Sequence, residues 1–175
     1  MRKPKLLGLE ELKSYAAMAL AARAQSSSEL RTRLRKKAAN KEDVEGIVAY
    51  LKEAGYVDDQ RFAGAFAEWR KENQGFGKSR VVRDLMSRKV APAVAQAAAE
   101  AAYKDSDEVK LIEDYIGRKY RGKDMKAFLA ETKNLASAFR RLRTAGFGSS
   151  NSIRVLKRYA SAAEQLEEMP EEIEE

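Results

Sequence analysis

The sequence contains no cysteine and no histidine. Their absence excludes disulfides, thiol nucleophiles, imidazole bases and the usual zinc sites. Only Asp, Glu, Lys and Tyr remain for acid–base chemistry, and no arrangement of them supports an active site, so we expect a non-enzymatic protein without a cofactor or a metal. Only three prolines occur in 175 residues, and Ala, Leu, Glu, Lys and Arg dominate. With no long run of alternating apolar and polar residues, this composition predicts an all-α fold.

Long apolar segments are also missing. The longest fully apolar run covers residues 16–22, far fewer than the roughly 20 residues that a membrane span needs. The basic start at residues 1–5 is not followed by an apolar core and a cleavage site, so no secretory signal is indicated. We therefore expect a cytoplasmic, monomeric protein that does not interact with membranes.

Charge is unevenly distributed along the chain. The net charge is +7, but the last twelve residues contain seven Glu and no Lys or Arg, so the rest carries +14, from 34 basic and 20 acidic residues. A basic body with an acidic tail favours a polyanionic partner or an acidic protein surface. The alternative is a soluble basic domain whose tail improves solubility.

Residues 55–63 predict a sharp corner between two helices. Gly55 suits the left-handed residue that ends a helix, and the Leu51–Tyr56 pair has the spacing of a Schellman ending. Asp58 is placed to cap the next helix, and Asp59 adds negative charge at the positive end of the helix dipole. Adjacent helical residues diverge by about 100°, so capping is favoured over a paired-carboxylate metal or acid–base site.

Two further patterns have a structural and a functional interpretation. Residues 77–79 (Gly-Lys-Ser) end like a phosphate loop, but position 72 is Glu and no strand precedes, so a helix start with a basic first turn is favoured. Phe62, Phe66 and Trp69 could stack on bases. Their helical spacing instead predicts packing.

The helices repeat with a period of about 50 residues. Under a shift of 51, Ser28, Leu30 and Leu34 match Ser79, Val81 and Leu85; under a further shift of 57, Val81, Leu85 and Val90 match Ala138, Leu142 and Phe147. We therefore predict three tandem three-helix modules, helix-turn-helix-like repeats stacked into an elongated, curved array. The predicted divisions are a basic arm (1–8), three modules (9–57, 58–104 and 105–163) and an acidic tail (164–175), which we expect to be frayed. The alternative is one compact nine-helix bundle.

Basic residues recur on the second helix of each module. They are Arg31, Arg33, Arg35, Lys36 and Lys37 in the first, Lys78, Arg80, Arg83, Arg88 and Lys89 in the second, and Arg140, Arg141 and Arg143 in the third. A single basic helix is usually a solvated face. Recurrence in stacked modules would instead build one basic strip that follows a phosphate backbone or an acidic protein groove. We predict these residues, with Arg70, as partner and nucleic-acid contacts.

Several of these patterns together resemble the RecX family, bacterial regulators of the RecA recombinase. The resemblance rests on Gly-Tyr-Val-Asp-Asp-x-Arg-Phe-Ala at 55–63, then Arg70, residues 77–80 and the upstream run 28–34, and it covers about residues 9–160 in order. The structural signature comprises Gly55, Tyr56, Asp58, Asp59, Arg61 and Phe62. The third module departs from the family pattern, because residues 121–133 form a long insertion.

The resemblance implies a partner and an activity. It implies binding in the groove of the RecA–single-stranded DNA filament, mainly to inhibit ATP hydrolysis, strand exchange and co-protease activity in recombination, DNA repair and the SOS response. Double-stranded DNA is a further expected partner. Arg70 and Arg80 are the contacts that the family motif supports most directly. The alternative is a stand-alone DNA-binding protein with basic helix-turn-helix-like modules, although Asn and Gln are scarce on the basic helices, which weakens base readout.

Overall fold

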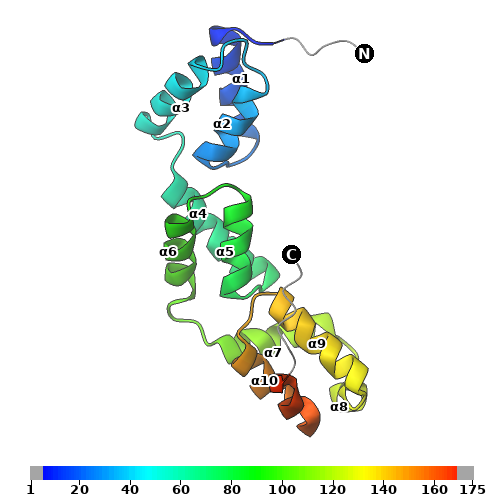
Figure 1. The fold of residues 1–175 in the computed structure, drawn as a ribbon. Helices are drawn as coiled ribbons and strands as arrows, with labels where there is room; N and C mark the ends of the chain where they lie inside the picture. The colour runs from blue at the N-terminus through cyan, green and yellow to red at the C-terminus, as the bar shows by residue number, and fades with distance from the viewer. Residues whose placement is uncertain (1–5, 169–175) are drawn as a thin grey trace, which may run out of the picture. The chain divides into compact units, whose positions relative to one another are not determined.

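A computed structural model describes residues 6–168, which fold into helices without strands; one isolated bridge joins Leu7 and Ala38 (Figure 1). The predicted all-α fold is confirmed. None of the helices in this range is long and apolar enough to cross a membrane. Contacts divide the described chain into unit 1, residues 6–67 and 82–101, and unit 2, residues 68–81 and 102–168. The predicted second module is thus shared between the units, and the three-module division with its curved stacking stays a prediction.

Unit 1 begins with a three-helix module of α1 (Leu9–Ala22), α2 (Ser27–Arg35) and α3 (Asp43–Glu53) (Figure 1). Ser26 and Glu29 have the Ser-x-x-Glu spacing of a capping box, and they form one, because the Ser26 hydroxyl accepts the Glu29 N–H and the Glu29 carboxylate accepts the Ser26 N–H. Periodic apolar residues of the three helices and the following corner form one core: Leu12, Ala16, Ala19, Leu30, Leu34, Ala38, Val44, Ile47, Val48, Leu51 and Val57.

The corner after α3 forms as its sequence predicts. Gly55 has a φ of 74°, and the Tyr56 N–H donates to the Leu51 carbonyl at 2.9 Å, which is the Schellman pattern. Asp58 then caps α4 (Asp59–Trp69), because its carboxylate accepts the backbone N–H groups of Gln60 and Arg61, each at 2.9 Å. Local hydrogen bonding alone therefore fixes the turn between α3 and α4.

Asp59 has a second role that the sequence did not reveal. Its carboxylate accepts the Ser27 N–H at 2.7 Å and the Ser27 hydroxyl at 2.6 Å, so the start of α4 is bound to the start of α2. Burial alone would raise the pKa of Asp59, but the hydrogen bonds from Ser27 and the charge of Lys52 lower it below its ordinary value. The ionised carboxylate is therefore the form that stabilises this contact.

The chain continues with α5 (Lys78–Ser87) and α6 (Pro92–Tyr103), most of which belong to unit 1. Ala63, Leu85, Ala95 and Ala99 are buried in this part of unit 1. Proline stands at the first position of α6, where its missing N–H costs no hydrogen bond. The predicted aromatic stripe of α4 divides: Phe62 is only 8% exposed, whereas Trp69, which belongs to unit 2, is 49% exposed. The packing prediction is therefore wrong for Trp69.

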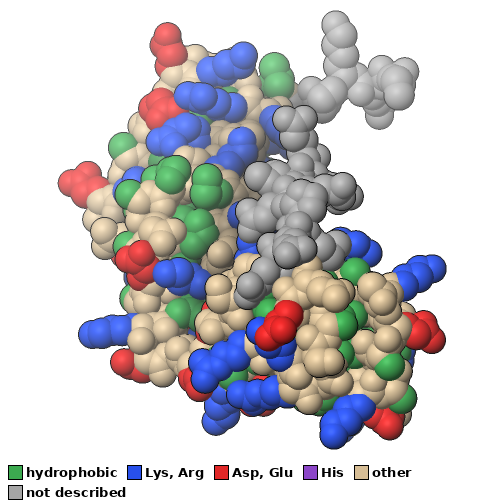
Figure 2. Space-filling model, turned by 60° about the horizontal axis from the view of Figure 1, so that its bottom comes forward, with side chains coloured by type: hydrophobic (Ala, Val, Ile, Leu, Met, Phe, Trp, Pro, Cys, Tyr) green, Lys and Arg blue, Asp and Glu red, His purple; other side chains and the backbone are tan. Residues whose placement is uncertain are grey.

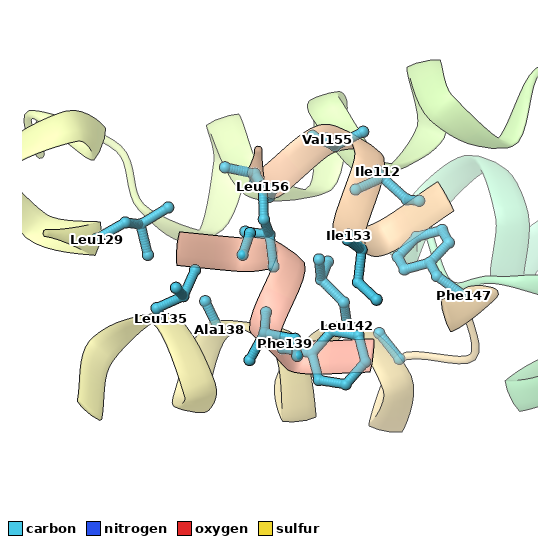
Figure 3. Packing of buried hydrophobic residues seen from close by; sticks show 14 residues of the cluster. Ile112, Leu129, Leu135, Ala138, Phe139, Leu142, Phe147, Ile153, Val155 and Leu156 are labelled. Atoms are coloured by element: carbon cyan, nitrogen blue, oxygen red, sulfur yellow. The ribbon is translucent and has the colours of Figure 1, made fainter. Parts of the chain in front are cut away.

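Unit 2 contains a short π-helix, η1 (Arg70–Gln74), and then α7 (Glu108–Lys119), α8 (Met125–Leu129), α9 (Thr132–Thr144), α10 (Ser149–Leu156) and a 3₁₀-helix, η2 (Ser161–Glu168). These last five elements enclose one apolar core (Figure 3). Its largest fully buried members are Ile112, Leu129, Leu135, Leu142, Phe147 and Leu156.

Two predictions about this region are wrong. The sequence predicts nine helices, whereas the described residues form ten α-helices together with η1 and η2. The additional α-helix is α8, which lies within the long stretch 121–133. The start of the expected frayed tail is helical instead: Leu166 in η2 is 5% exposed and joins the core, and Glu164 pairs with Lys157 at 2.8 Å. The remaining tail residues, 169–175, lie outside the described range.

Each unit contains the same kind of joint between the start of one basic helix and the end of another. In unit 1 the Ser26 hydroxyl, before α2, donates to the Arg88 carbonyl, after α5, at 2.7 Å. In unit 2 the Gly77 N–H, before α5, donates to the Ala145 carbonyl, after α9, at 2.8 Å. The shifts of 51 and 57 residues relate these two pairs of positions. The repeat therefore conserves a contact as well as a pattern of apolar residues.

The joint in unit 2 depends on two glycines in close contact. A Cβ atom on Gly77 would lie 2.3 Å from the Gly146 carbonyl oxygen, and a Cβ atom on Gly146 would lie 2.3 Å from the backbone nitrogen of Arg80. Gly146 also has a φ of 93°, a conformation that other residues adopt only with strain. The Ser79 N–H donates to the Gly146 carbonyl at 3.3 Å, which completes the joint.

Substituting Gly146 tests this joint. Gly146→Ala is expected to destabilise the protein by at least about 1–3 kcal/mol, because the new Cβ adds a clash to the strained φ. Gly117→Ala, within α7 of the same unit and facing open space, is the matched control and should stabilise by about 0.5–1 kcal/mol. Urea unfolding of both variants measures the difference. Equal stability of G146A and the wild type would contradict the close contact.

Substituting Asp59 tests the contact between α4 and α2. Asp59→Asn should destabilise by about 1–3 kcal/mol at pH 7, because it removes a charged acceptor from two donors. The folded-state pKa is lowered, so this stabilisation is present above the ordinary pKa of about 4 and disappears as the pH falls through the folded value. The unfolding midpoints of variant and wild type should therefore converge in acid.

Asp58→Asn is the control for this experiment, because Asn caps helices about as well as Asp. It should remain close to wild type at both pH values. A difference in unfolding midpoint between D59N and the wild type that persists unchanged at low pH would show that the charge of Asp59 does not stabilise the contact between α4 and α2.

Candidate partner-binding surface

Lys and Arg side chains are spread over the face of the molecule shown in Figure 2, with Asp and Glu side chains between them. The predicted contact residues must therefore be separated into those used inside the fold and those available to a partner. The hydrogen bonds and ion pairs within each unit show which of these side chains are used inside the fold. In the described residues no group of three or more His, Cys, Asp or Glu side chains is placed to hold a metal ion.

Two arginines of the first basic helix share one glutamate. Arg31 lies 2.9 Å and Arg35 2.8 Å from the carboxylate oxygens of Glu45 on α3. The hydrogen bond from Arg31 holds the pKa of Glu45 below its ordinary value, and Arg35 acts in the same direction. Glu45 thus offsets part of the charge that the sequence assigns to this helix. Lys36 at its end is exposed and Lys37 is half-buried.

Arg33 is held within the first module. Its Nε donates to the Tyr15 hydroxyl at 3.0 Å, a terminal nitrogen donates to the Gln25 side-chain oxygen at 3.4 Å, and the guanidinium lies 5.7 Å from the Tyr15 ring centroid. These contacts join α2 to α1 and to the loop between them. The structure therefore supports a packing role for Arg33.

Arg88 belongs to the joint of unit 1. Its guanidinium forms a partly buried ion pair with Glu29 at 3.2 Å and lies 5.0 Å from the Phe62 ring centroid and 5.3 Å from that of Phe66. The ring of Phe62, one of the signature residues, thus packs against Arg88, which binds Glu29 of α2. This contact gives Phe62 a structural role. Lys89, next in the chain, is exposed with a φ of 60°.

The other signature residues stay at the corner between α3 and α4. Arg61 donates to the Gly55 carbonyl at 2.9 Å and braces the turn. Tyr56 is 67% exposed and contributes its backbone N–H to the helix ending. The corner is thus stabilised by its backbone hydrogen bonds and by the side chains of Asp58 and Arg61, and the exposed Tyr56 ring lies outside the core.

Unit 2 brings together three predicted contact residues. Arg80, Arg140 and Arg141 line a surface cleft of about 390 Å³. The remaining lining residues, which the sequence reasoning missed, are Phe76, Tyr115, Ser137, Thr144 and Ala145. The spacing of Ser137, Arg141 and Thr144 on α9 follows one helical face and could have indicated them. None of the described residues that line the cleft is acidic.

Arg80 is positioned by the joint of unit 2. Its guanidinium lies 5.3 Å from the Phe76 ring centroid and donates to the Thr144 carbonyl at 3.4 Å, at the end of α9. A cation is favourable there because the carbonyl end of a helix is its negative end. The Tyr103 hydroxyl donates to the Phe76 carbonyl at 2.5 Å and so holds the ring that supports Arg80. The glycine contact at 77 and 146 therefore determines where Arg80 lies.

The α9 arginines point to different environments. Arg140 and Arg141 are exposed at the cleft. Burial raises the pKa of Tyr120, and the nearby charge of Arg141 opposes this shift. Arg143 instead donates to the Phe147 carbonyl at 2.8 Å and is half-buried, so it is part of the turn after α9. The structure thus separates Arg143 from the cleft arginines.

The predicted contact residues of η1 and α5 also differ in their surroundings. Arg70 bonds to Gln74 and lies 5.5 Å from the Phe76 ring centroid, beside the cleft. Lys78 and Arg83 are exposed on α5. Among the predicted contacts, unit 2 therefore gathers Arg80, Arg140 and Arg141 at one cleft with Arg70 beside it. In unit 1, Arg31, Arg33, Arg35 and Arg88 all take part in bonds within the fold.

Comparison with known proteins finds relatives in sequence and in fold. Residues 58–98 match the family model described as RecX, second three-helix domain. The crystal structure of RecX from Lactobacillus salivarius is similar in fold, with a TM-score of 0.65 at 15% identity over 86% of this chain and 96% of that chain. A second crystal structure, of regulatory protein RecX, gives a TM-score of 0.62 at 16% identity over 84% and 72% of the two chains.

Curated relatives with detectable sequence identity are named Regulatory protein RecX. The protein from Amycolatopsis mediterranei (strain U-32) is 34% identical over 89 residues, which span 51% of each chain, so the match covers about half the length of this relative. The protein from Escherichia coli O7:K1 (strain IAI39 / ExPEC) is 32% identical over 117 residues, which cover 60% of this chain and 68% of that protein. With the shared helical-repeat fold, this identity shows that the chain belongs to the RecX family of regulatory proteins.

Proposed function

We propose that this protein is a non-enzymatic regulator, mainly an inhibitor, of the RecA recombinase. It binds in the groove of the RecA–single-stranded DNA filament and lowers ATP hydrolysis, strand exchange and co-protease activity, and so acts in recombination, DNA repair and the SOS response. The observation that carries the proposal is membership of a family whose curated relatives are named regulatory proteins.

The distribution of charge supports a filament as the partner. The second helices of the three predicted modules, α2, α5 and α9, are each rich in basic residues, and each module can add a modest contact. Once one module is bound, the others bind at a high effective concentration because they are tethered to it. Exposed side chains such as Lys36, Lys78 and Lys89 are available for an acidic protein surface or for phosphates. A monomer acting in the cytoplasm is part of this proposal.

Assays of RecA activity test the proposal. Added in a stoichiometric amount to RecA assembled on single-stranded DNA, the protein is expected to lower the rates of ATP hydrolysis and of strand exchange, because it occupies the filament groove. Both rates are measured at constant ionic strength. Unchanged ATP hydrolysis and strand exchange would reject a regulatory role on the filament.

Gel-shift experiments separate the proposal from stand-alone DNA binding. A RecA regulator should shift RecA–DNA complexes at concentrations at which it leaves free duplex DNA unshifted. A protein that acts on DNA alone should bind duplex equally well without RecA and lose affinity steeply with salt.

A further inference from the structure

Unit 2 carries a series of contacts in which aromatic rings and guanidinium groups alternate. The Arg70 guanidinium carbon lies 5.8 Å from the Trp69 ring centroid and 5.5 Å from that of Phe76. The Arg80 guanidinium carbon lies 5.3 Å from the same Phe76 ring. The order of contacts is therefore Trp69, Arg70, Phe76 and Arg80, and it connects an exposed ring with the cleft.

The two ends of this series offer different chemistry. Trp69 is the only tryptophan of the chain and is 49% exposed, so part of its ring is available for stacking. Arg80 opens onto the cleft of about 390 Å³, where it meets Arg140 and Arg141 with the hydroxyl-bearing residues Ser137 and Thr144. Three guanidinium groups and two hydroxyls, with no acidic side chain among the described lining residues, form a site for an anion.

The combination fits single-stranded nucleic acid better than an acidic protein segment. Guanidinium forks and hydroxyls bind phosphate oxygens, and unpaired bases stack on aromatic rings and on guanidinium planes, whatever their sequence. An acidic protein segment would bind the guanidinium groups through its carboxylates, and the exposed indole of Trp69 beside them would remain without a contact. In a duplex the bases are already stacked and paired, so the ring would have no base to receive.

Unit 1 provides an internal comparison. There Arg31 and Arg35 already bind the Glu45 carboxylate. In unit 2 the acidic residue next to the indole, Glu68, is paired with Lys71 at 3.4 Å, so its charge is partly offset. The cleft of unit 2 is therefore the better place for an external polyanion.

We infer that Trp69 and the cleft form one binding site for single-stranded nucleic acid, with phosphates at Arg80, Arg140 and Arg141 and a base on the Trp69 ring. The inference rests on the proposed function, since it assigns these residues to the DNA of the filament and not to RecA. Binding is nevertheless a property of unit 2 itself and is measurable without RecA.

Fluorescence of the sole tryptophan reports the binding directly. Titration of the full-length protein with an oligothymidylate is expected to quench Trp69 emission in a saturable manner, because a stacked base contacts the indole. A duplex and a poly-glutamate peptide of equal charge should bind more weakly and quench less. Equal binding and quenching by poly-glutamate would instead identify a site for an acidic protein segment, and an oligothymidylate that leaves emission unchanged would overturn the stacking.

Paired variants test the phosphate contacts. Arg140→Ala with Arg141→Ala is expected to reduce the slope of log affinity against log salt by about 1.4, because each lost phosphate contact on a single strand removes about 0.7. Lys110→Ala with Arg154→Ala removes the same charge from exposed positions of unit 2 outside the cleft and should leave the slope nearly unchanged. Equal slopes for the two double variants would contradict the site.

A third pair tests the stacking. Trp69→Ala is expected to weaken binding of a labelled oligothymidylate by about 5- to 150-fold, the range measured for single base–aromatic stacks. Tyr50→Ala removes an exposed ring from unit 1 and should have little effect. Circular dichroism checks that both variants keep their helicity. A W69A variant that binds as tightly as wild type would reject the base contact.

The RecA assay distinguishes the two proposals. If the wild type inhibits RecA but does not bind the oligothymidylate, the site is wrong and the regulatory function stands. If it binds the oligothymidylate through the cleft but leaves RecA unaffected, the site stands and the regulatory function is wrong.

Discussion

The close contact between the start of one basic helix and the end of another organises both units. In unit 1, the Ser26 hydroxyl makes this contact by donating to the Arg88 carbonyl, and Asp59 binds the neighbouring Ser27 from the start of α4. In unit 2, Gly77 and Gly146 make it with backbone alone, because neither has a Cβ atom to hold the helices apart. Helix ends that meet in this way satisfy their free backbone groups and bring opposite ends of two helix dipoles together. The same joint therefore serves stability and determines the position of nearby arginines.

The joint has different consequences in the two units. In unit 1 the neighbouring arginine, Arg88, pairs with Glu29 and covers two phenylalanine rings, so its charge is used inside the fold. The position of Glu29 corresponds to Arg80 under the 51-residue shift, and this exchange of charge leaves unit 2 with a cation beside α9. A repeated scaffold thus holds an arginine–glutamate pair inside the fold in one place and lines a cleft with three arginines in another.

Local features of the fold could be predicted from the sequence because they depend on neighbouring residues. The Schellman ending at Gly55, the cap at Asp58 and the capping box at Ser26 all form over a few residues. The bonding partners of the arginines could not be predicted in this way. Arg33 and Arg88 bind Tyr15 and Glu29, which are 18 and 59 residues away in the chain. Composition indicated a basic surface, whereas only packing distinguishes an arginine that is held inside the fold from one that lines a cleft.

Electron cryo-microscopy of the protein on RecA–single-stranded DNA filaments would show whether unit 2 meets the DNA through the cleft between Arg80 and α9. We expect density that joins the side chains of Arg80, Arg140 and Arg141 to the DNA backbone, with Trp69 beside a base. A filament-bound protein whose cleft faces solvent, or contacts only RecA, would contradict this expectation.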